Sequence, residues 1–306
     1  MTKLINVNNL THDYGHGRGV FDVTFEVTKG ETLGFLGPNG AGKSTTMRHL
    51  MGFSSPQKGS VSIDGLNCTK NSSKIMQSVG YLPGEVALPE GLSGDEFIKM
   101  MQGMRKTKND ENVKALLERF RLDPKSRVKK MSIGEKRKLA VVAAFMDDPD
   151  ILLLDEPTSG LDPLMQEVFI DFIKEQKQKG KTILLSSHIF SEVEALCDRI
   201  AIIKDGRLVS TVTSAEIAHG LHNIMTVGFE NEADFESFGK APLSFKLKDR
   251  SSLKCSVIVD DEDINKFVSF IKDKKLRFFD EHSVTLEEYF MHYYKTDKRF
   301  GGISYV

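Results

Sequence analysis

The chain has few cysteines, no excess of either charge and no long apolar run, and each absence excludes a class of protein. Its three cysteines, Cys68, Cys197 and Cys255, lie far apart without a CxxC pair, which excludes a disulfide scaffold and a zinc site and favours a reducing compartment. The formal net charge is −1, so the chain as a whole does not attract nucleic acid or anionic lipid. No apolar run reaches the ~18 residues of a bilayer-spanning helix, and the first ten residues lack the apolar core of a signal peptide.

What remains is an ordinary globular composition with the pattern of an α/β fold. The 306 residues are 40% hydrophobic and 28% charged, enough for one large domain and a smaller one. Apolar runs at 31–36, 151–154 and 182–187 are typical of parallel strands buried on both faces, and helical patterns separate them. The Asp205-Gly206 pair predicts the turn of a hairpin.

Two further regions differ from this core in their hydrophobic pattern. Residues 84–147 are dominated by helical patterning, which predicts a helical subdomain. From about residue 220 to 306 short alternating strands mix with amphipathic helices, one of which places Ile264, Phe267, Val268 and Ile271 on one face. We expect a small α+β accessory domain of ferredoxin-like type in residues 220–306, after a first domain in residues 1–215.

The strongest motif is GPNGAGKS, which matches the phosphate-binding pattern GxxxxGK[ST] and stands between an apolar strand and a helix. Its glycines let successive backbone N–H groups point at phosphate oxygens, and the helix N-terminus adds partial positive charge. The pattern assigns Lys43 to the β and γ phosphates and the Ser44 hydroxyl to Mg²⁺. We expect ATP to contact the following residues: Gly37, Pro38, Asn39, Gly40, Ala41, Gly42, Lys43, Ser44 and Thr45.

A second motif places two carboxylates after the apolar run at 151–154. Ligands bind at the carboxyl ends of strands in open α/β sheets, where Asp155 is expected to hold Mg²⁺ and Glu156 to polarise the attacking water. Taken alone, the same pattern also fits a strand that ends in solvated acids. The upstream phosphate-binding loop favours the catalytic interpretation.

His188 follows the apolar run at 182–187. A single histidine at a strand end is usually only a satisfied polar residue. Here its strand is expected to lie beside the strand of the phosphate-binding loop. We therefore predict that His188 contacts the γ-phosphate and orients the attacking water.

Together these motifs resemble those of the ATP-binding cassette (ABC) ATPases over residues 1–215. GPNGAGKST resembles the Walker A motif of that family, ILLLDEP its Walker B motif with the catalytic glutamate, and SGLD, ending at Asp162, its D-loop. His188 resembles the switch histidine. Tyr14 resembles the aromatic residue that stacks on adenine, although a surface tyrosine at a strand end would look the same.

Two motifs depart from the family pattern. The signature, usually LSGGQ, is here MSIGE at 131–135, which keeps Ser132 and Gly134 for the nucleotide and adds the charge of Glu135. After YLP the family usually has a Mg²⁺-binding glutamine, where this chain has Gly84 followed by Glu85. We expect Glu85, or a water molecule, to take that metal contact.

The resemblance implies an α/β P-loop NTPase with a RecA-like core, an antiparallel β-subdomain and a helical subdomain, followed by the α+β domain. It further implies ATP and Mg²⁺ as cofactors, a homodimer or a paired second ATPase subunit, and hydrolysis that drives a separate membrane permease from the cytoplasmic face. The segment Thr285–Tyr294 resembles the end of exporter ATPase subunits, which favours export, although a helix packed on its own domain fits equally.

Other kinds of ABC ATPase remain as alternatives. Ribosome-acting members typically carry two cassettes, whereas this chain has one phosphate-binding motif. DNA-repair members insert a long coiled coil before the signature, but only 88 residues separate Lys43 from Met131, without sustained heptads. The near-neutral charge also disfavours a nucleic-acid partner. Glu156 and His188 argue against a module that binds without hydrolysis.

Overall fold

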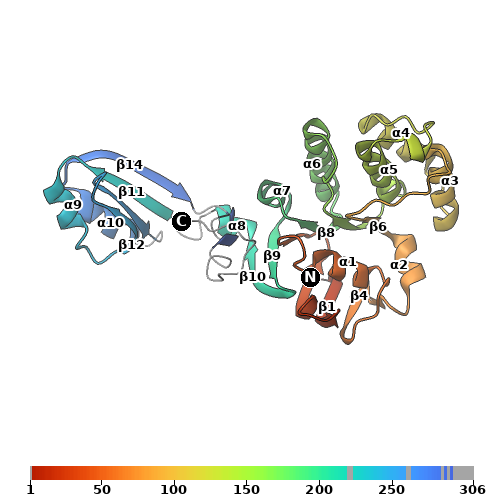
Figure 1. Ribbon diagram of the computed structural model, residues 1–306, viewed down its shortest axis with the longest axis horizontal. Helices are drawn as coiled ribbons and strands as arrows, with labels where there is room; N and C mark the ends of the chain where they lie inside the picture. The colour runs from red at the N-terminus through yellow and green to blue at the C-terminus, as the bar shows by residue number, and fades with distance from the viewer. Residues whose placement is uncertain (1, 219–222, 260–262, 284–285, 288–289, 292–306) are drawn as a thin grey trace. The chain divides into compact units, whose positions relative to one another are not determined.

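The computed structural model describes residues 2–218, 223–259, 263–283, 286–287 and 290–291. The chain divides into two compact units, Met1–Val212 and Thr213–Val306. The first unit contains two sheets and a group of helices, and the second contains one further sheet (Figure 1).

A six-stranded sheet forms the centre of the first unit. Its strands stand in the order β10 (Arg207–Thr213), β9 (Arg199–Lys204), β3 (Thr32–Leu36), β8 (Thr182–Ser187), β7 (Ile151–Asp155) and β6 (Val79–Leu82). The pairs β9–β3, β3–β8, β8–β7 and β7–β6 are all parallel. Strands β3, β7 and β8 are buried along their whole length, as expected for apolar runs covered on both faces. The prediction of an α/β fold is confirmed.

The turn predicted at Asp205-Gly206 is present. It joins the neighbouring strands β9 and β10, and both turn residues have positive φ, 46° at Asp205 and 74° at Gly206. Two positive φ values in a two-residue loop match the twist of a hairpin.

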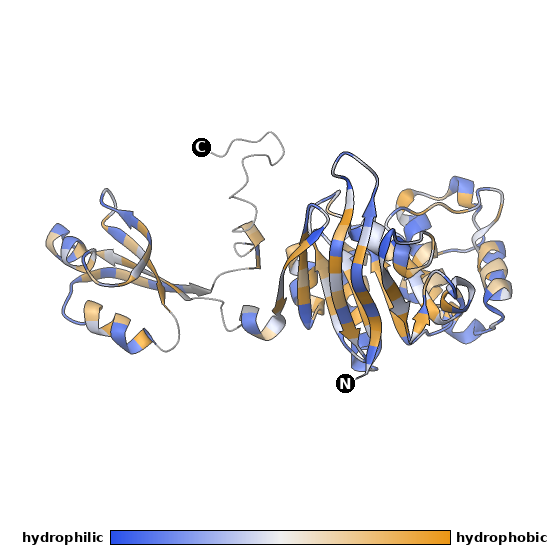
Figure 2. Ribbon diagram, turned by 90° about the horizontal axis from the view of Figure 1, so that it is seen from below, coloured by the Kyte–Doolittle hydropathy of each residue, from blue (hydrophilic) through white to orange (hydrophobic). Residues whose placement is uncertain are grey.

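An antiparallel sheet packs beside the central one. Its strands stand in the order β2 (Gly19–Thr28), β1 (Lys3–Asp13), β4 (Lys58–Ile63) and β5 (Leu66–Asn67). Buried and exposed residues alternate along much of β1 and β2, so each strand shows alternating apolar and polar colour (Figure 2). The buried faces form one core with Met47 and Leu50 of helix α1 and with Phe35 and Leu184 of the central sheet.

Helices cover both faces of the central sheet (Figure 1). On the side of the antiparallel sheet lies α1 (Lys43–Leu50), and on the other side lie α6 (Pro163–Gln178) and α7 (Phe190–Leu196). Helix α2 (Ser72–Ser78) precedes β6. Between β6 and β7 the chain forms the helical region, which contains α3 (Gly94–Arg105), α4 (Asp110–Arg119), the 3₁₀ turn η1 (Val128–Lys130) and α5 (Ile133–Phe145). Helix α8 (Ser214–Ala218) follows β10. The three helices α3 to α5 fall within the predicted helical subdomain at 84–147.

The register of the parallel strands brings the predicted catalytic segments to one edge of the sheet. Leu36, the last residue of β3, pairs with Ser187, and Asp155, the last residue of β7, pairs with Ser186. The phosphate-binding loop, the two carboxylates and His188 therefore all follow the carboxyl ends of neighbouring strands, where α/β sheets bind ligands.

The second unit has the βαββαβ order of a ferredoxin-like domain. In chain order its elements are β11 (Asn223–Phe229), α9 (Glu232–Phe238), β12 (Ser244–Asp249), β13 (Lys254–Val259), α10 (Ile264–Ile271) and β14 (Leu276–Ser283). The sheet order is β12-β13-β11-β14 and the three pairings are antiparallel. Phe229, Phe238 and Phe267 lie in its core. Most of the segment predicted to be helical at Thr285–Tyr294 lies outside the described residues.

The packing of α7 against β3 leads to a stability prediction at Gly34. A Cβ on Gly34 would lie 2.6 Å from Cγ1 of Val193 and 2.7 Å from Sγ of Cys197, both buried. We expect Gly34→Ala to lower the free energy of unfolding by about 1–3 kcal/mol, because a close-packed core cannot move aside without strain. The measurement is the transition of the first unit in differential scanning calorimetry.

Gly103→Ala is the matched control. Gly103 lies inside α3, and a Cβ there would have no neighbour within 4 Å. This substitution is expected to raise stability by about 0.5–1 kcal/mol, because alanine is the better helix former. Equal shifts for the two variants would mean that the approach of α7 to β3 is looser than described.

Candidate functional site

The phosphate-binding loop connects β3 to α1. Gly40 and Gly42 have φ of 84° and 107°, a conformation that glycine adopts without strain, and Gly42 is the N-cap of α1. Gly37 lies so close to β9 that a Cβ would meet the Ile203 carbonyl oxygen at 2.5 Å. These positions explain why the loop needs glycine where the motif has it.

Lys43 is buried and its ammonium group bends back over this loop. Its Nζ donates to the carbonyl oxygens of Gly37, at 2.6 Å, and Pro38, at 3.1 Å. The same Nζ lies 3.0 Å from Oε1 of Glu156. Lys43 therefore joins the end of β3 to the segment after β7.

Asp155 ends β7 and is only 2% exposed. The Ser186 hydroxyl, on the neighbouring strand β8, donates to its Oδ1. The backbone N–H of Glu156 donates to the Ser186 carbonyl oxygen at 3.0 Å and lies 3.2 Å from the Ser186 hydroxyl oxygen. Ser186 thus fixes both carboxylate residues relative to β8.

Glu156 stands between two predicted catalytic partners. Its Oε1 pairs with Lys43, and His188 Nδ1 lies 2.5 Å from its Oε2. Glu156 has φ of 47°, a left-handed conformation that costs a residue with a side chain about 1–3 kcal/mol. The fold therefore holds Glu156 in a backbone conformation that such a residue disfavours, and this places its carboxylate between Lys43 and His188. Backbone strain of this kind is common at functional sites.

Tyr14 follows the last residue of β1 and is 55% exposed. The ring of His12 lies 4.5 Å from that of Tyr14, centroid to centroid, and 4.9 Å from that of His49. Burial lowers the pKa of His49, which favours the neutral ring. Tyr14 presents an aromatic face backed by two further rings, the kind of surface on which a base stacks.

The signature residues begin α5 as a complete capping box. Ser132 is the N-cap, its hydroxyl accepts from the backbone N–H of Glu135, and the Glu135 carboxylate accepts from the Ser132 backbone N–H. The same carboxylate lies 2.8 Å from the Ser132 hydroxyl oxygen. These hydrogen bonds hold the pKa of Glu135 below its usual value. The Ser132 hydroxyl is therefore engaged within its own helix.

The other signature and D-loop residues lie close to this turn. A Cβ on Gly134 would lie 3.3 Å from the Gly160 carbonyl oxygen, so the start of α5 contacts the D-loop of the same chain. Asp162 is the N-cap of α6, where its Oδ1 accepts from the backbone N–H of Met165 at 3.0 Å. The structure thus brings Lys43, Asp155, Glu156 and His188 together, whereas Ser132 and Asp162 bond within the first turns of their own helices.

Gly84 lies against the Walker B carboxylate. A Cβ on it would stand 3.1 Å from Oδ2 of Asp155. Glu85, the next residue, is exposed. This close approach leaves little room for a side chain at position 84.

Three residues of this region escaped the sequence analysis. Arg137 is buried and donates to the backbone carbonyl oxygens of Asp155 and Glu156. Ser186 donates to the Asp155 carboxylate and accepts from the Glu156 backbone N–H. Glu192 accepts a hydrogen bond from the Ser187 hydroxyl beside His188. Burial raises the pKa of Glu192. Only Ser186 gave a signal, since it lies near the end of an apolar strand that leads into the predicted site.

The donor set fits a nucleotide with a divalent cation. Lys43 offers a buried ammonium beside a loop whose glycines Gly40 and Gly42 adopt positive φ, the backbone conformation of a phosphate-binding loop. Ser44 and Asp155 supply oxygen atoms, the ligands that Mg²⁺ prefers. Among the described residues no cluster of three or more His, Cys, Asp or Glu forms a separate metal site.

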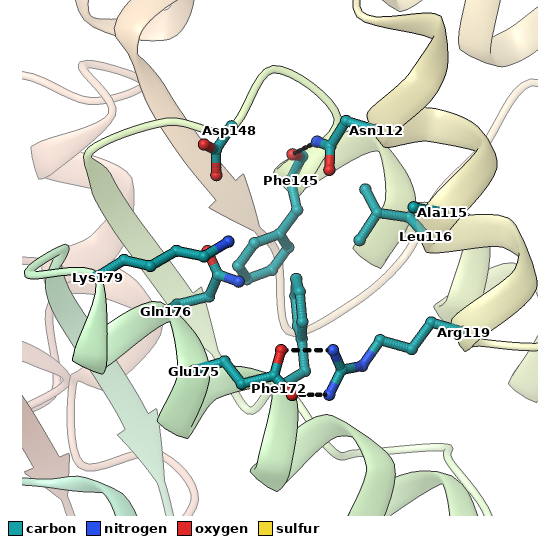
Figure 3. Close-up of a pocket in the computed structure, with 10 residues that line it drawn as sticks. All are labelled: Asn112, Ala115, Leu116, Arg119, Phe145, Asp148, Phe172, Glu175, Gln176 and Lys179. Atoms are coloured by element: carbon teal, nitrogen blue, oxygen red, sulfur yellow. Dashed lines mark hydrogen bonds and ion pairs between the residues drawn. The ribbon is translucent and has the colours of Figure 1, made fainter.

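A separate cavity of about 300 Å³ lies between α4, α5 and α6 (Figure 3). On one side of it Arg119 donates to both carboxylate oxygens of Glu175, at 2.6 and 2.7 Å, and its guanidinium stands 4.8 Å from the Phe172 ring centroid. None of the residues that line it belongs to the predicted site. The Arg119–Glu175 pair ties the helical region to α6.

In the part of the chain that the structure describes, we find no helix that combines the length and the apolar character needed to cross a membrane.

Comparison with known proteins identifies relatives of the first unit. A family model described as "ABC transporter" matches residues 20–159. The uncharacterized ABC transporter ATP-binding protein YhcH of Bacillus subtilis is 36% identical over 214 residues, which cover 68% of this chain and 70% of YhcH. The Nod factor export ATP-binding protein I of Cupriavidus pinatubonensis is 34% identical over 215 residues, 69% of this chain and 66% of that protein.

A solved structure described as the ATP-binding subunit of an ABC transporter has the same fold. It superimposes with a TM-score of 0.66 at 34% identity and covers 70% of this chain and 91% of its own.

The contacts of Lys43 lead to a binding prediction. Removal of the ammonium in Lys43→Ala is expected to weaken ATP binding at least about a hundredfold, since a buried charge-assisted contact to phosphate is lost together with loop geometry. Isothermal titration calorimetry with a non-hydrolysable ATP analogue measures this. Lys181→Ala is the control, because Lys181 is also buried but bonds to Asp148 and to the Pro149 carbonyl. Equal affinity in the two variants would refute the role of Lys43.

Proposed function

This chain belongs to the ABC transporter ATP-binding proteins, which hydrolyse ATP, and we propose that it drives export through a separate permease as half of an ATP-dependent dimer. One observation supports the catalytic assignment above all. Lys43, Glu156 and His188 form a single chain of polar contacts at the carboxyl ends of β3, β7 and β8.

In the proposed reaction ATP competes with Glu156 for Lys43. The phosphate oxygens take the ammonium that Glu156 now holds, and the released carboxylate accepts a hydrogen bond from the attacking water and then its proton. His188, hydrogen-bonded to Glu156, keeps the carboxylate oriented and donates to the γ-phosphate oxygen as charge develops. The products are ADP and inorganic phosphate.

Ser44 and Asp155 would hold the Mg²⁺ ion of the nucleotide. The ion supplies neutralising charge to the phosphates. Asp155 is held by the Ser186 hydroxyl and stays in place as the nucleotide enters. We propose that Glu85, exposed in the loop after β6, completes the metal contacts directly or through a water molecule. The close approach of Gly84 to Asp155 supports a ligand from the next residue rather than from position 84.

The position of the signature supports a dimer. Ser132 and Gly134 stand at an exposed turn, where the side chain of Ile133 is 80% exposed. In the proposed dimer this turn faces the phosphate-binding loop of the other subunit, so that one γ-phosphate binds both chains. The adenine stacks on Tyr14, and Asp162 contacts the nucleotide across the interface. With an identical partner the interface is isologous.

Export is supported by a relative. The Nod factor export ATP-binding protein I shares 34% identity over 215 residues. The helical region between β6 and β7 would transmit the motion to the permease at the cytoplasmic face of the membrane.

Co-purification tests the transport role. A tagged chain extracted from membranes in mild detergent is expected to retain a polytopic permease subunit, and its ATPase rate is expected to rise several-fold when the complex enters lipid, because the permease orders the dimer. Ribosomes or DNA in the purified complex would point instead to a non-transport ATPase. An extracellular solute-binding protein in the complex would contradict export.

The hydrolytic role of Glu156 leads to a separate prediction. Glu156→Gln is expected to bind ATP but to lower kcat by about a hundredfold or more, since the general base is lost. The variant should accumulate a closed dimer with ATP, visible as doubled mass in gel filtration with light scattering. Glu175→Gln, on the outer side of α6, should turn over normally. A monomer under saturating ATP would contradict the dimer mechanism.

A further inference from the structure

Arg137 is the largest fully buried side chain in the described part of the chain, with 2% exposure. Its guanidinium makes hydrogen bonds to backbone carbonyl oxygens of two loops. Three belong to the Walker B segment, from Asp155, Glu156 and Pro157, and two belong to the loop after β6, from Pro83 and Gly84. Each of its three nitrogen atoms takes part.

A buried cation of this kind is held by its surroundings. Burial lowers the pKa of Arg137 to about 10, and the nearby charges of Asp155, Glu192 and Glu156 act in the opposite direction, so the group stays charged at neutral pH. Because guanidinium is planar and rigid, its carbonyl partners are fixed in direction as well as in distance. An ammonium group has no such fork and cannot span the same set of acceptors.

Arg137 contacts the backbone of Glu156, the residue proposed as the general base. Glu156 has positive φ, and its carbonyl oxygen accepts from Arg137. Its N–H is held by Ser186 on the other side. The backbone of Glu156 is thus fixed at both ends, and its carboxylate is thereby placed between Lys43 and His188.

Arg137 also lies on the helix that begins with the signature. Ser132 caps α5, and Arg137 stands five residues later in the same helix. The side chain therefore links α5 to both loops, the one that carries Glu156 and the one at Pro83 and Gly84. A shift of α5 would move the acceptors on both loops together.

We propose that Arg137 is a positioning residue for ATP hydrolysis, which holds Glu156 in its catalytic conformation and couples it to the signature helix and to the loop at 83–84. This inference rests on the proposed role of Glu156 as general base. In this role one buried guanidinium, bonded only to backbone carbonyls, connects the Walker B segment, the signature helix and the loop at 83–84. Arg137 would touch neither the nucleotide nor the attacking water.

A second buried arginine provides the matched control. Arg105 of α3 donates to the Val79 carbonyl oxygen and pairs with Asp147, at 3.3 Å each, and its side chain is 8% exposed. These partners lie at the beginning of β6 and after α5, away from the catalytic carboxylates. Arg105→Lys therefore removes a buried guanidinium without touching the Walker B segment.

The experiment measures ATPase turnover and nucleotide affinity in Arg137→Lys, Arg137→Gln, Arg105→Lys and Glu156→Gln, with the melting temperature of each. We expect both Arg137 variants to lose at least tenfold in kcat, because a small misplacement of a catalytic group is costly, while the Kd for a non-hydrolysable analogue changes less than threefold. Arg105→Lys should keep normal kcat even if it melts earlier. Adding Arg137→Lys to Glu156→Gln should lower kcat no further, because the two act through one group.

The outcomes separate the two claims. Normal kcat in Arg137→Lys and Arg137→Gln, with kcat lost in Glu156→Gln, would overturn the role of Arg137 alone. Normal kcat in Glu156→Gln would overturn the proposed general base. Parallel losses of kcat and affinity, in step with the melting temperature and equal to those of Arg105→Lys, would show that Arg137 acts only in stability. If Arg137→Gln fails to fold, Arg137→Lys, which keeps the charge, decides the question.

Discussion

The ion pair between Lys43 and Glu156 is the contact on which the rest of the site depends. It joins the helix after β3 to the turn after β7, two segments that are more than a hundred residues apart and meet only because parallel strands end at one edge. Lys43 is buried and the Oε1 atom of Glu156 that faces it is shielded from solvent, so the ammonium depends on this carboxylate for its counter-charge. In the proposed mechanism a phosphate group that takes over Lys43 would release Glu156. Binding of ATP and activation of the base would then be one event.

Much of this site could be predicted from the sequence because its parts are local. The loop from Gly37 to Ser44 needs glycines at fixed intervals for backbone reasons, and that requirement is visible in the sequence. The run at 151–154 shows a strand buried on both faces and places Asp155 at its end. In the second unit alternation predicted strands and the helix at 264–271, whereas helix α9 (Glu232–Phe238), which completes the ferredoxin-like order, was not predicted. Fold class and family are thus confirmed.

The supporting contacts could not be predicted, because they depend on packing between distant elements. Arg137 stands among Glu135, Lys136 and Lys138, and nothing in that charged run distinguishes the one side chain that turns inward. Ser186 acts through a hydroxyl aimed at a neighbouring strand, which no spacing reveals. The reach of Glu156 toward His188 likewise depends on a backbone conformation that a residue with a side chain seldom adopts. The roles of these residues remain proposals.

The altered signature acquires a physical explanation from its capping box. Glu135 stabilises the start of α5 by accepting from Ser132, so the same hydroxyl that a phosphate would need is already bonded. Exchange of one hydrogen bond for another changes free energy by only about 1 kcal/mol, whereas two negative charges about 4 Å apart repel by about 4 kcal/mol at the effective dielectric near a protein surface. In the proposed dimer, closure on ATP would therefore require Glu135 to turn away into solvent. The carboxylate that completes the start of α5 would oppose that closed state and favour release of the two subunits after hydrolysis.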